Sequence, residues 1–177
     1  MKRRIFLLCA AVLFAWTSFA QIGYKGQVVL STGGGVNQFG GLNAAFRIEG
    51  YVSAHSVLGA GVSYDRTGYR TVEGDVFRAV QWLGAVGYRY ARPLGRFIVS
   101  PGVGFVLGGE SCDAASRWGH PLPYRGQFVY GFCVDVGAEY VWGRHWAVFL
   151  CPRLQYLVKT QFQNFEFLTN IGVKFYF

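Results

Sequence analysis

The stretch from Gln127 to Trp142, QFVYGFCVDVGAEYVW, alternates with period two along its whole length. Successive side chains of a β-strand point to opposite faces, so this pattern predicts one long strand. One face of this strand is apolar, and the opposite face holds two carboxylates, Asp135 and Glu139. Strands of this kind place their apolar face either against a soluble core or against lipid. The apolar face consists of Phe128, Tyr130, Phe132, Val134, Val136, Ala138, Tyr140 and Trp142.

Further alternating runs bring the number of expected strands to eight. Several have ten or more residues, whereas soluble strands usually have about five or six and tilted membrane strands about nine to eleven. Eight is the smallest even strand number found in bacterial membrane barrels. We therefore expect an all-β fold, an eight-stranded antiparallel up-and-down transmembrane β-barrel of the outer-membrane type. The expected strands cover about residues 26–33, 41–51, 56–66, 76–91, 96–107, 127–142, 146–159 and 166–177.

The expected connections alternate between short and long. Short turns of the Gly, Pro and Ser kind are predicted at 53–56, 92–95 and 142–145. Longer links are predicted at 33–40, 66–75, 108–126 and 160–165. Outer-membrane barrels have short periplasmic turns and longer external loops, so both chain ends are expected on the periplasmic side.

The composition also favours strands over helices as membrane-spanning elements. Charged residues make up 15% of the chain, against about 25% in typical soluble domains. After the N-terminal segment, no stretch offers 18 uninterrupted apolar residues, the length that indicates a transmembrane helix. A membrane protein with this sequence must therefore cross the bilayer with a closed sheet.

The N-terminus has the layout of a secretory signal peptide. Three basic residues at positions 2–4 precede an apolar run, and Ser18-Phe19-Ala20 supplies the small residues of a cleavage site. We expect residues 1–20 to be removed before Gln21, with 21–177 forming one barrel domain; an uncleaved anchor is the alternative. Cys9 follows Leu8, where lipoprotein processing requires a small residue, so lipidation is disfavoured.

The net charge gives no sign of nucleic-acid binding. Cleavage would remove three positive charges and lower the formal net charge from +8 to +5. The remaining basic residues are scattered, without the cluster that recognition of nucleic acid requires. We expect no direct nucleic-acid binding.

Several charged residues fall on the faces expected to line the barrel lumen. A barrel of eight strands is just wide enough for side chains to fill, so these charges would lie in a packed core and not in a pore. Buried charges need partners, and four basic with three acidic residues allow paired networks. We favour structural salt bridges over a proton relay or a small-solute channel. The residues are Arg47, Glu49, Arg89, Asp135, Glu139, Arg153 and Lys174.

The last strand, FLTNIGVKFYF, ends the chain on an aromatic residue. Its apolar face includes Val173, Phe175 and Phe177. A terminal alternating strand that ends in an aromatic residue resembles the assembly signal of bacterial outer-membrane proteins. This resemblance implies that the barrel-insertion machinery recognises these three residues.

Catalytic and metal sites have little support, and we expect neither catalytic, cofactor-binding nor metal-binding residues. His55 and His145 fall in periplasmic turns, and only His120 lies in an external loop. That loop could bring together a nucleophile, a base and an acid, as in the lipid-modifying barrel enzymes. It contains Glu110, Ser111, Asp113, Ser116 and His120.

The mature chain would contain three cysteines, an odd number that forbids complete intramolecular pairing. Cys133 and Cys151 could form a disulfide if the strand register permits, although reduced core residues are favoured. Cys112 lies in the long loop. No Cys-x-x-Cys or histidine pair has metal-ligand spacing.

The second half of the chain contains an ordered series of pieces: a glycine-rich strand and acidic loop, an F-x-Y-G strand opening, a short turn before an apolar strand, a Q/K-x-F element and a final G-x-x-F-x-F. The residues concerned are Phe128, Tyr130, Gly131, Gln161, Phe162, Gly172, Phe175 and Phe177. In the order of these pieces the chain is similar to the TraO family of conjugative-transposon proteins, and SVLGAGVSYDRTGYR adds weaker similarity in the first half. The signal sequence ending in SFAQ looks like those of exported Bacteroidetes proteins.

The TraO resemblance implies an outer-membrane component of a conjugative DNA-transfer apparatus that acts through other conjugation proteins and carries out no chemistry of its own. Its expected surroundings are outer-membrane lipid and the insertion machinery. The alternatives are a general small barrel with an envelope, adhesion or secretion role, a lipid-modifying enzyme using the 108–126 loop, and a secreted lipocalin-like barrel with its apolar face inward.

Overall fold

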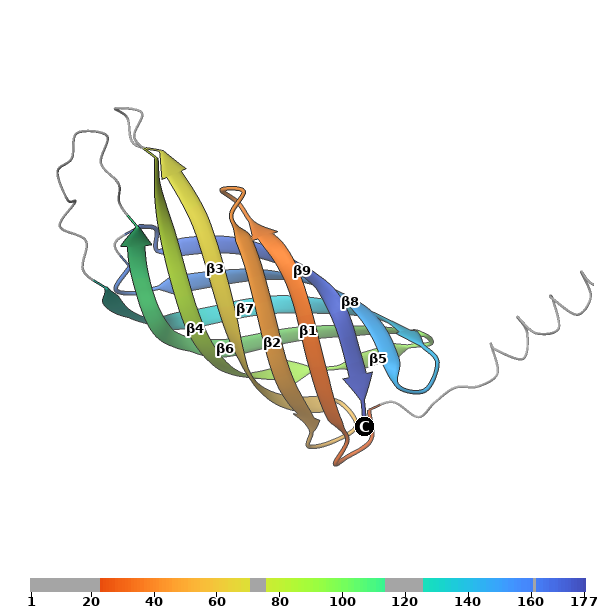
Figure 1. The fold of residues 1–177 in the computed structure, drawn as a ribbon. Coiled ribbons are helices and arrows are strands. Elements are labelled where there is room, and N and C mark those ends of the chain that lie inside the picture. The colour runs from red at the N-terminus through yellow and green to blue at the C-terminus, as the bar shows by residue number, and fades with distance from the viewer. Residues whose placement is uncertain (1–22, 71–75, 114–125, 161) are drawn as a thin grey trace, which may run out of the picture.

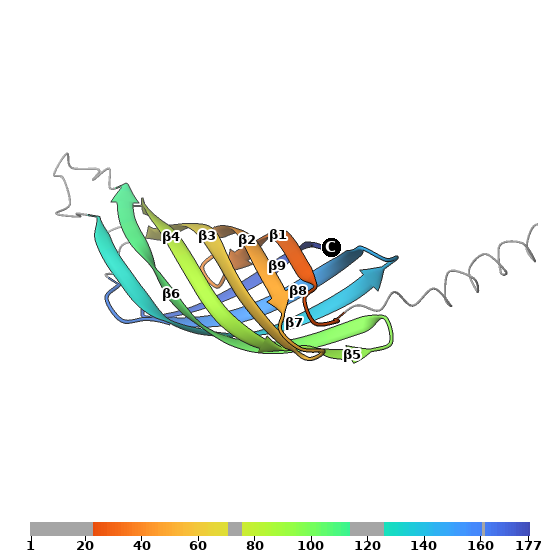
Figure 2. The ribbon, with the colours of Figure 1, turned by 90° about the horizontal axis from the view of Figure 1, so that it is seen from below.

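The computed structural model describes residues 23–70, 76–113, 126–160 and 162–177, which form strands and turns (Figure 1). Nine strands belong to one antiparallel sheet. The described part has no helix with the length and apolarity to cross a membrane. The sheet is closed, because β4 pairs with β6 in addition to its pairing with β3, and Figure 2 shows these two strands side by side.

Eight of the strands make the wall of the barrel. The ninth, β5 (Arg92–Leu94), is a three-residue strand that pairs with the start of β6 at the turn after β4. Each wall strand pairs with its neighbours in the chain, and β9 pairs with β1, so the topology is up-and-down. The wall strands are β1 (Val28–Asn37), β2 (Leu42–Tyr51), β3 (Ser56–Arg70), β4 (Val76–Tyr90), β6 (Phe97–Asp113), β7 (Gln127–Trp142), β8 (Trp146–Leu157) and β9 (Phe165–Tyr176).

The predicted eight-stranded barrel is confirmed, but three strands extend further than predicted. The β1, β3 and β6 strands continue to Asn37, Arg70 and Asp113. In β1 the glycines at 33–35 are not a loop: Gly33 pairs with Ala45 on one side and with Gly172 on the other. The β1–β2 connection is therefore only residues 38–41, and the prediction of a long link there is wrong.

The register of the barrel determines its tilt. The register can be followed once around the barrel, from each residue to its partner on the next strand. Starting at Val28, the partners are Gly50, Leu58, Tyr88, Val103, Val134, Leu154 and Phe167. The Phe167 carbonyl accepts a hydrogen bond from the Gln38 amide, so the path returns to β1 ten residues after Val28. With standard strand spacings, a shear of ten residues over eight strands corresponds to a tilt of about 40°. A strand of ten residues then spans about 25 Å along the barrel axis, the height of a membrane barrel's apolar band.

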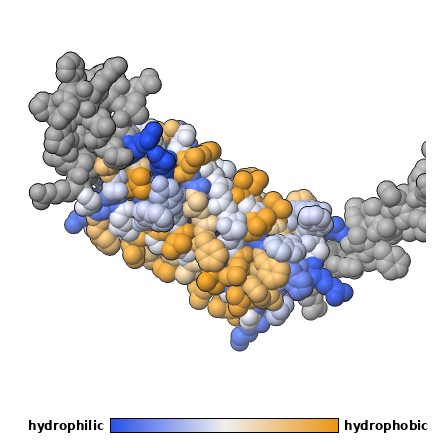
Figure 3. Space-filling view, in the orientation of Figure 1, coloured by the Kyte–Doolittle hydropathy of each residue, from blue (hydrophilic) through white to orange (hydrophobic). Residues whose placement is uncertain are grey.

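The outer surface of the wall is apolar. All eight residues of the alternating face of β7 point outward, as predicted, from Phe128 with 60% exposure to Trp142 with 73%. Figure 3 shows apolar side chains across the middle of the barrel and polar ones towards its ends. Exposed aromatic rings lie near both ends: Tyr88, Tyr90, Phe97, Tyr140, Trp142, Trp146 and Phe177 at the end with the C-terminus, and Phe39, Trp82, Phe128 and Phe165 at the other. We call these the turn end and the loop end.

The interior of the barrel is filled by side chains of alternating strand positions. At the turn end a buried apolar cluster closes the lumen, formed by Val29, Tyr51, Val57, Ala91, Ile98, Ala147 and Tyr176. Above it, towards the middle, lie charged side chains. The loop half of the lumen is polar again, with buried Asn, Gln, Asp and Glu side chains.

Candidate functional site: the charged lumen

Two buried glutamates share one lysine at the centre of the lumen. Lys174 contacts Glu49 and lies with its Nζ 2.9 Å from Glu139 Oε1. All three residues are 3–4% exposed. The Tyr176 hydroxyl donates to Glu139 Oε2 at 2.5 Å. The alternation of β9 explains this arrangement, because Lys174 and Tyr176 are two residues apart and therefore face the same side.

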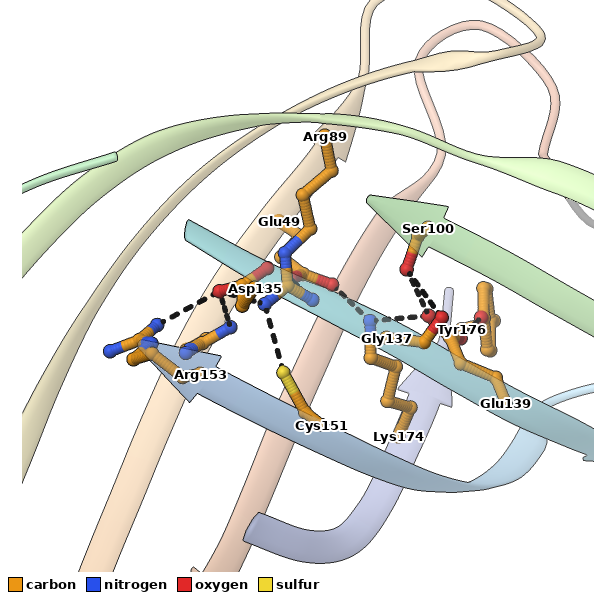
Figure 4. A network of polar contacts seen from close by, with 11 residues as sticks. Glu49, Arg89, Ser100, Asp135, Gly137, Glu139, Cys151, Arg153, Lys174 and Tyr176 are labelled. Atoms are coloured by element: carbon orange, nitrogen blue, oxygen red, sulfur yellow. Dashed lines mark hydrogen bonds and ion pairs between the residues drawn. The ribbon is translucent and has the colours of Figure 1, made fainter. Parts of the chain in front are cut away.

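Three guanidinium groups surround the third carboxylate, Asp135. Its Oδ2 lies 2.9 Å from Arg89, 3.3 Å from Arg153 and 3.6 Å from Arg47. Arg89 also pairs with Glu49 at 3.2 Å and so joins the two halves of the network (Figure 4). The seven residues expected in the lumen are thus brought together by six ion pairs. They come from β2, β4, β7, β8 and β9, so the network links strands far apart in sequence.

Glycines make room for the long basic side chains. A Cβ at Gly61 would lie 2.6 Å from Cγ of Arg47, and one at Gly102 would lie 2.6 Å from Cγ of Arg89. These positions point into the lumen, where any larger residue would displace an arginine. The small residues of β3 and β6 are therefore part of the network, although they carry no polar side chain.

Sequence reasoning missed three members of this site. Ser100 Oγ lies 3.5 Å from Glu139 Oε1, and Cys151 Sγ lies 3.5 Å from Arg89. Tyr176 is the third. All three are buried at inward positions of their strands, and the alternation within each strand is the signal that could have placed them in the lumen. Their contacts depend on the register between strands, which no single strand reveals.

The lumen beside the network is packed and does not form a channel. A cavity of about 40 Å³ is lined by Arg47, Asp135, Arg153 and neighbouring small residues. A water molecule needs roughly 10–15 Å³ of such volume, so the cavity holds a few waters at most. Asp135 Oδ1 and Arg153 Nε have no protein hydrogen-bond partner and are suitable partners for such waters. This geometry suits a structural core and not solute passage.

The C-terminal strand is fully incorporated into the wall. Val173 and Phe177 point outward with 42% and 56% exposure, and the Phe177 amide donates to the Val28 carbonyl at 2.9 Å. The Phe175 ring lies 4.8 Å from both Phe177 and Trp146. The three residues of the predicted assembly signal therefore lie on the outer surface at the turn end.

The residues considered for a loop hydrolase are not brought together in the described part of the chain. Glu110 is buried in the lumen at 2% exposure, whereas the next residue, Ser111, is exposed on the outside. Ser116 and His120 lie outside the described residues. His55 and His145 contact the backbone carbonyls of Ala91 and Tyr176 at 3.1 and 2.8 Å, as structural supports of turns.

Cys133 and Cys151 are not joined by a disulfide. Cys133 pairs in register with Gln155, four residues from Cys151 in the same strand, so the register does not permit a disulfide between them. Within the described ranges, no three His, Cys, Asp or Glu side chains lie close enough together to hold a metal ion by themselves.

No protein-family model matches the chain, and no curated protein matches it. Several solved structures match its fold. OprG from Pseudomonas aeruginosa aligns with a TM-score of 0.63 and 10% identity over 89% of this chain and 99% of OprG. Ail, the attachment invasion locus protein of Yersinia pestis, aligns with 0.58 and 7% over 86% and 99%. The N-terminal β-barrel domain of P. aeruginosa OprF aligns with 0.55 and 14% over 86% and 98%.

Identities this low show the fold alone. With the closed ring of eight antiparallel strands, the matches establish an up-and-down β-barrel of the transmembrane, outer-membrane type. The outward apolar surface agrees with this assignment and excludes the lipocalin-like alternative, whose apolar face would point inward.

Proposed function

We propose that this chain resides in the bacterial outer membrane and acts there as a structural, non-catalytic barrel. One observation carries the proposal: large apolar side chains cover the outside of every wall strand. Water-soluble proteins rarely expose continuous apolar patches larger than a few hundred Å². Lipid satisfies such a belt, and the aromatic residues near both ends match the two membrane interfaces.

The packed lumen supports a structural role. Six buried ion pairs and a cavity of about 40 Å³ beside them leave little space for a solute in this described part of the lumen. A function of this protein is therefore carried by its outer surface, its turns and its loops. Proteins that bind these surfaces are the expected partners.

Fractionation of cells that express the full-length chain tests the location. We expect the protein in the outer-membrane fraction, with a gel mobility that differs between unheated and boiled samples because the folded barrel resists SDS. Recovery as a soluble periplasmic protein would refute the proposal. N-terminal sequencing of the mature protein tests separately for removal of residues 1–20, with Gln21 as the expected first residue.

More specifically, we propose that the barrel belongs to a conjugative DNA-transfer apparatus, where it contacts other apparatus proteins. The similarity to the TraO family supports this assignment. Two of the matching residues, Gly131 and Gly172, lie at inward positions where neighbouring backbone approaches closely. Two others, Phe128 and Tyr130, lie on the outward face at the loop end and could meet a neighbouring protein.

Deletion of the gene in a donor strain tests the conjugation role. Transfer frequency should fall and should recover when the wild-type gene is supplied in trans, while detergent sensitivity of the envelope stays unchanged. Unchanged transfer in the deletion strain would favour the alternative, a general small barrel with an envelope or adhesion role.

We also propose that the insertion machinery recognises Val173, Phe175 and Phe177 before the barrel closes. Phe177→Ala should lower the amount of heat-shifting, assembled barrel in the outer membrane at equal synthesis. Phe165→Ala is a matched control, because Phe165 lies at the other end of the same strand with 55% exposure against 56% for Phe177. Equal loss of assembly in both variants would indicate a general effect of removing an aromatic ring.

A further inference from the structure

Asp65 and Glu166 are two of the buried carboxylates in the loop half of the lumen, and their hydrogen bonds within the described residues come from uncharged donors. Asp65 and Glu166 are each 4% exposed. Asn37 Nδ2 donates to both, at 3.2 Å to Asp65 Oδ1 and 3.1 Å to Glu166 Oε1. Thr67 donates to Asp65 at 2.6 Å and Gln155 donates to Glu166 at 2.6 Å. This pair therefore differs from Glu49, Glu139 and Asp135, each of which contacts a lysine or an arginine.

Three amide oxygens in the same region have no hydrogen-bond partner among the residues that the structure describes. They are Asn43 Oδ1, Gln81 Oε1 and Asn170 Oδ1, and their residues are 4–6% exposed. Such atoms are rare in folded proteins, because a buried acceptor without a partner is costly. These three oxygens are independent of the carboxylates, and they too can only accept.

The strand register places these oxygens in one row with Asp65. Asn43 is the partner of Asp65 on one side, and Gln81 is its partner on the other. Asn170 pairs with Gly35, which in turn pairs with Asn43. Asp65 is thus flanked on both sides by an amide oxygen that has no donor.

The amide oxygens of Asn43, Gln81 and Asn170 remain available to a further group in the lumen. A Cβ at Gly35 would lie 2.6 Å from Asn170 Oδ1, so this oxygen lies over the glycine, between its own strand and Asn43. Gln81 uses its nitrogen on Glu110 at 3.0 Å, and Asn43 uses its nitrogen on the Tyr64 carbonyl at 3.3 Å. In Gln81 and Asn43 the amide nitrogen thus faces a protein acceptor, and the amide oxygen remains for another partner.

A cation satisfies acceptors and negative charge together. Calcium binds six to eight oxygens from carboxylates, amide carbonyls and water in flexible geometry, whereas zinc prefers the nitrogen and sulfur ligands that are missing from this row. We propose that the loop half of the lumen binds a hard divalent cation of the calcium class through Asp65 and the amide oxygens of Asn43, Gln81 and Asn170. Glu166 supplies the second negative charge.

Calcium chloride titrated calorimetrically into the refolded, EDTA-treated barrel tests this site. The sample is first shown to be folded by its heat-dependent gel mobility, so a failure of the barrel itself is recognised separately. We expect saturable binding of one ion. At a calcium concentration of about one hundred times the dissociation constant, the folded state should be favoured about a hundredfold more than in EDTA.

Two variants locate the site and one serves as a control. Asp65→Asn keeps the shape and removes one charge, and Asn170→Ala removes one oxygen while the charges stay; each should weaken calcium binding at least tenfold. Glu49→Gln removes a carboxylate from the charge network instead and should leave calcium affinity unchanged. A folded wild-type barrel without calcium binding, or binding that both site variants retain, would overturn the proposal and assign the amide oxygens to buried water.

Discussion

Replacement of Lys174 by methionine tests the energetics of the lumen network most directly. The variant keeps the length of the side chain and removes the cation that contacts both Glu49 and Glu139. Because both carboxylates contact the same Nζ, their nearest oxygens lie within about 5 Å of each other. At an effective dielectric constant of about 20, two unit charges at this distance repel by about 3 kcal/mol.

The expected loss of folding free energy is about 3–5 kcal/mol, the range observed when one partner of a buried ion pair is removed. This corresponds to a ratio of folded to unfolded protein that is about two to four orders of magnitude lower. Urea titration of the barrel in lipid vesicles measures it, with the heat-dependent mobility shift as the readout of the folded fraction. Lys159→Met is the matched control, because Lys159 is exposed at the loop end and should change stability by less than about 0.5 kcal/mol.

A triple variant separates uncompensated charge from lost packing. Lys174→Met combined with Glu49→Gln and Glu139→Gln removes the charges of these three residues and should recover more than half of the lost stability, since neutral side chains avoid the desolvation of these ions. Arg89 keeps Asp135 as its partner in this variant. The reasoning is refuted if Lys174→Met is as stable as Lys159→Met. It is also refuted if the triple variant is no more stable than Lys174→Met, because the loss would then come from packing.

Three further changes test other parts of the structure. Val134→Arg places a charge in the middle of the outward face of β7 and should destabilise the inserted barrel by about 2–4 kcal/mol, measured by the same urea titration. Gly102→Leu should prevent folding, since even a Cβ would lie 2.6 Å from Arg89 Cγ. Gly109→Leu is the control and should fold, because a Cβ there meets nothing closer than 4.0 Å. The heat-shifting band on a gel shows whether each variant folds. The thiols of Cys133 and Cys151 should both react with a thiol reagent after denaturation without reductant. The loss of both reactive groups, as a disulfide between them would cause, would contradict the observed register.

Much of the fold follows from local patterns. The period-two alternation of β7 and β9 determines which side chains face outward, because adjacent Cβ atoms on a strand must point to opposite faces. The strand count and the clear turns at Gly95 and Gly143, where φ is positive, then determine an up-and-down barrel. The glycines of β1 were misassigned to a loop because a glycine needed for close strand approach and one needed for a turn look the same in a sequence.

The sequence by itself therefore determined the strands, their faces and the set of charges in the lumen, since each of these depends on neighbouring residues. Only the closed tertiary structure decided which charges meet. Lys174 and Glu49 are 125 positions apart in the chain, and their contact depends on the pairing of β9 with β1 and of β1 with β2. The same register places Asp65 between Asn43 and Gln81. A shift of two residues in any one ladder would keep every face unchanged and would still separate these partners.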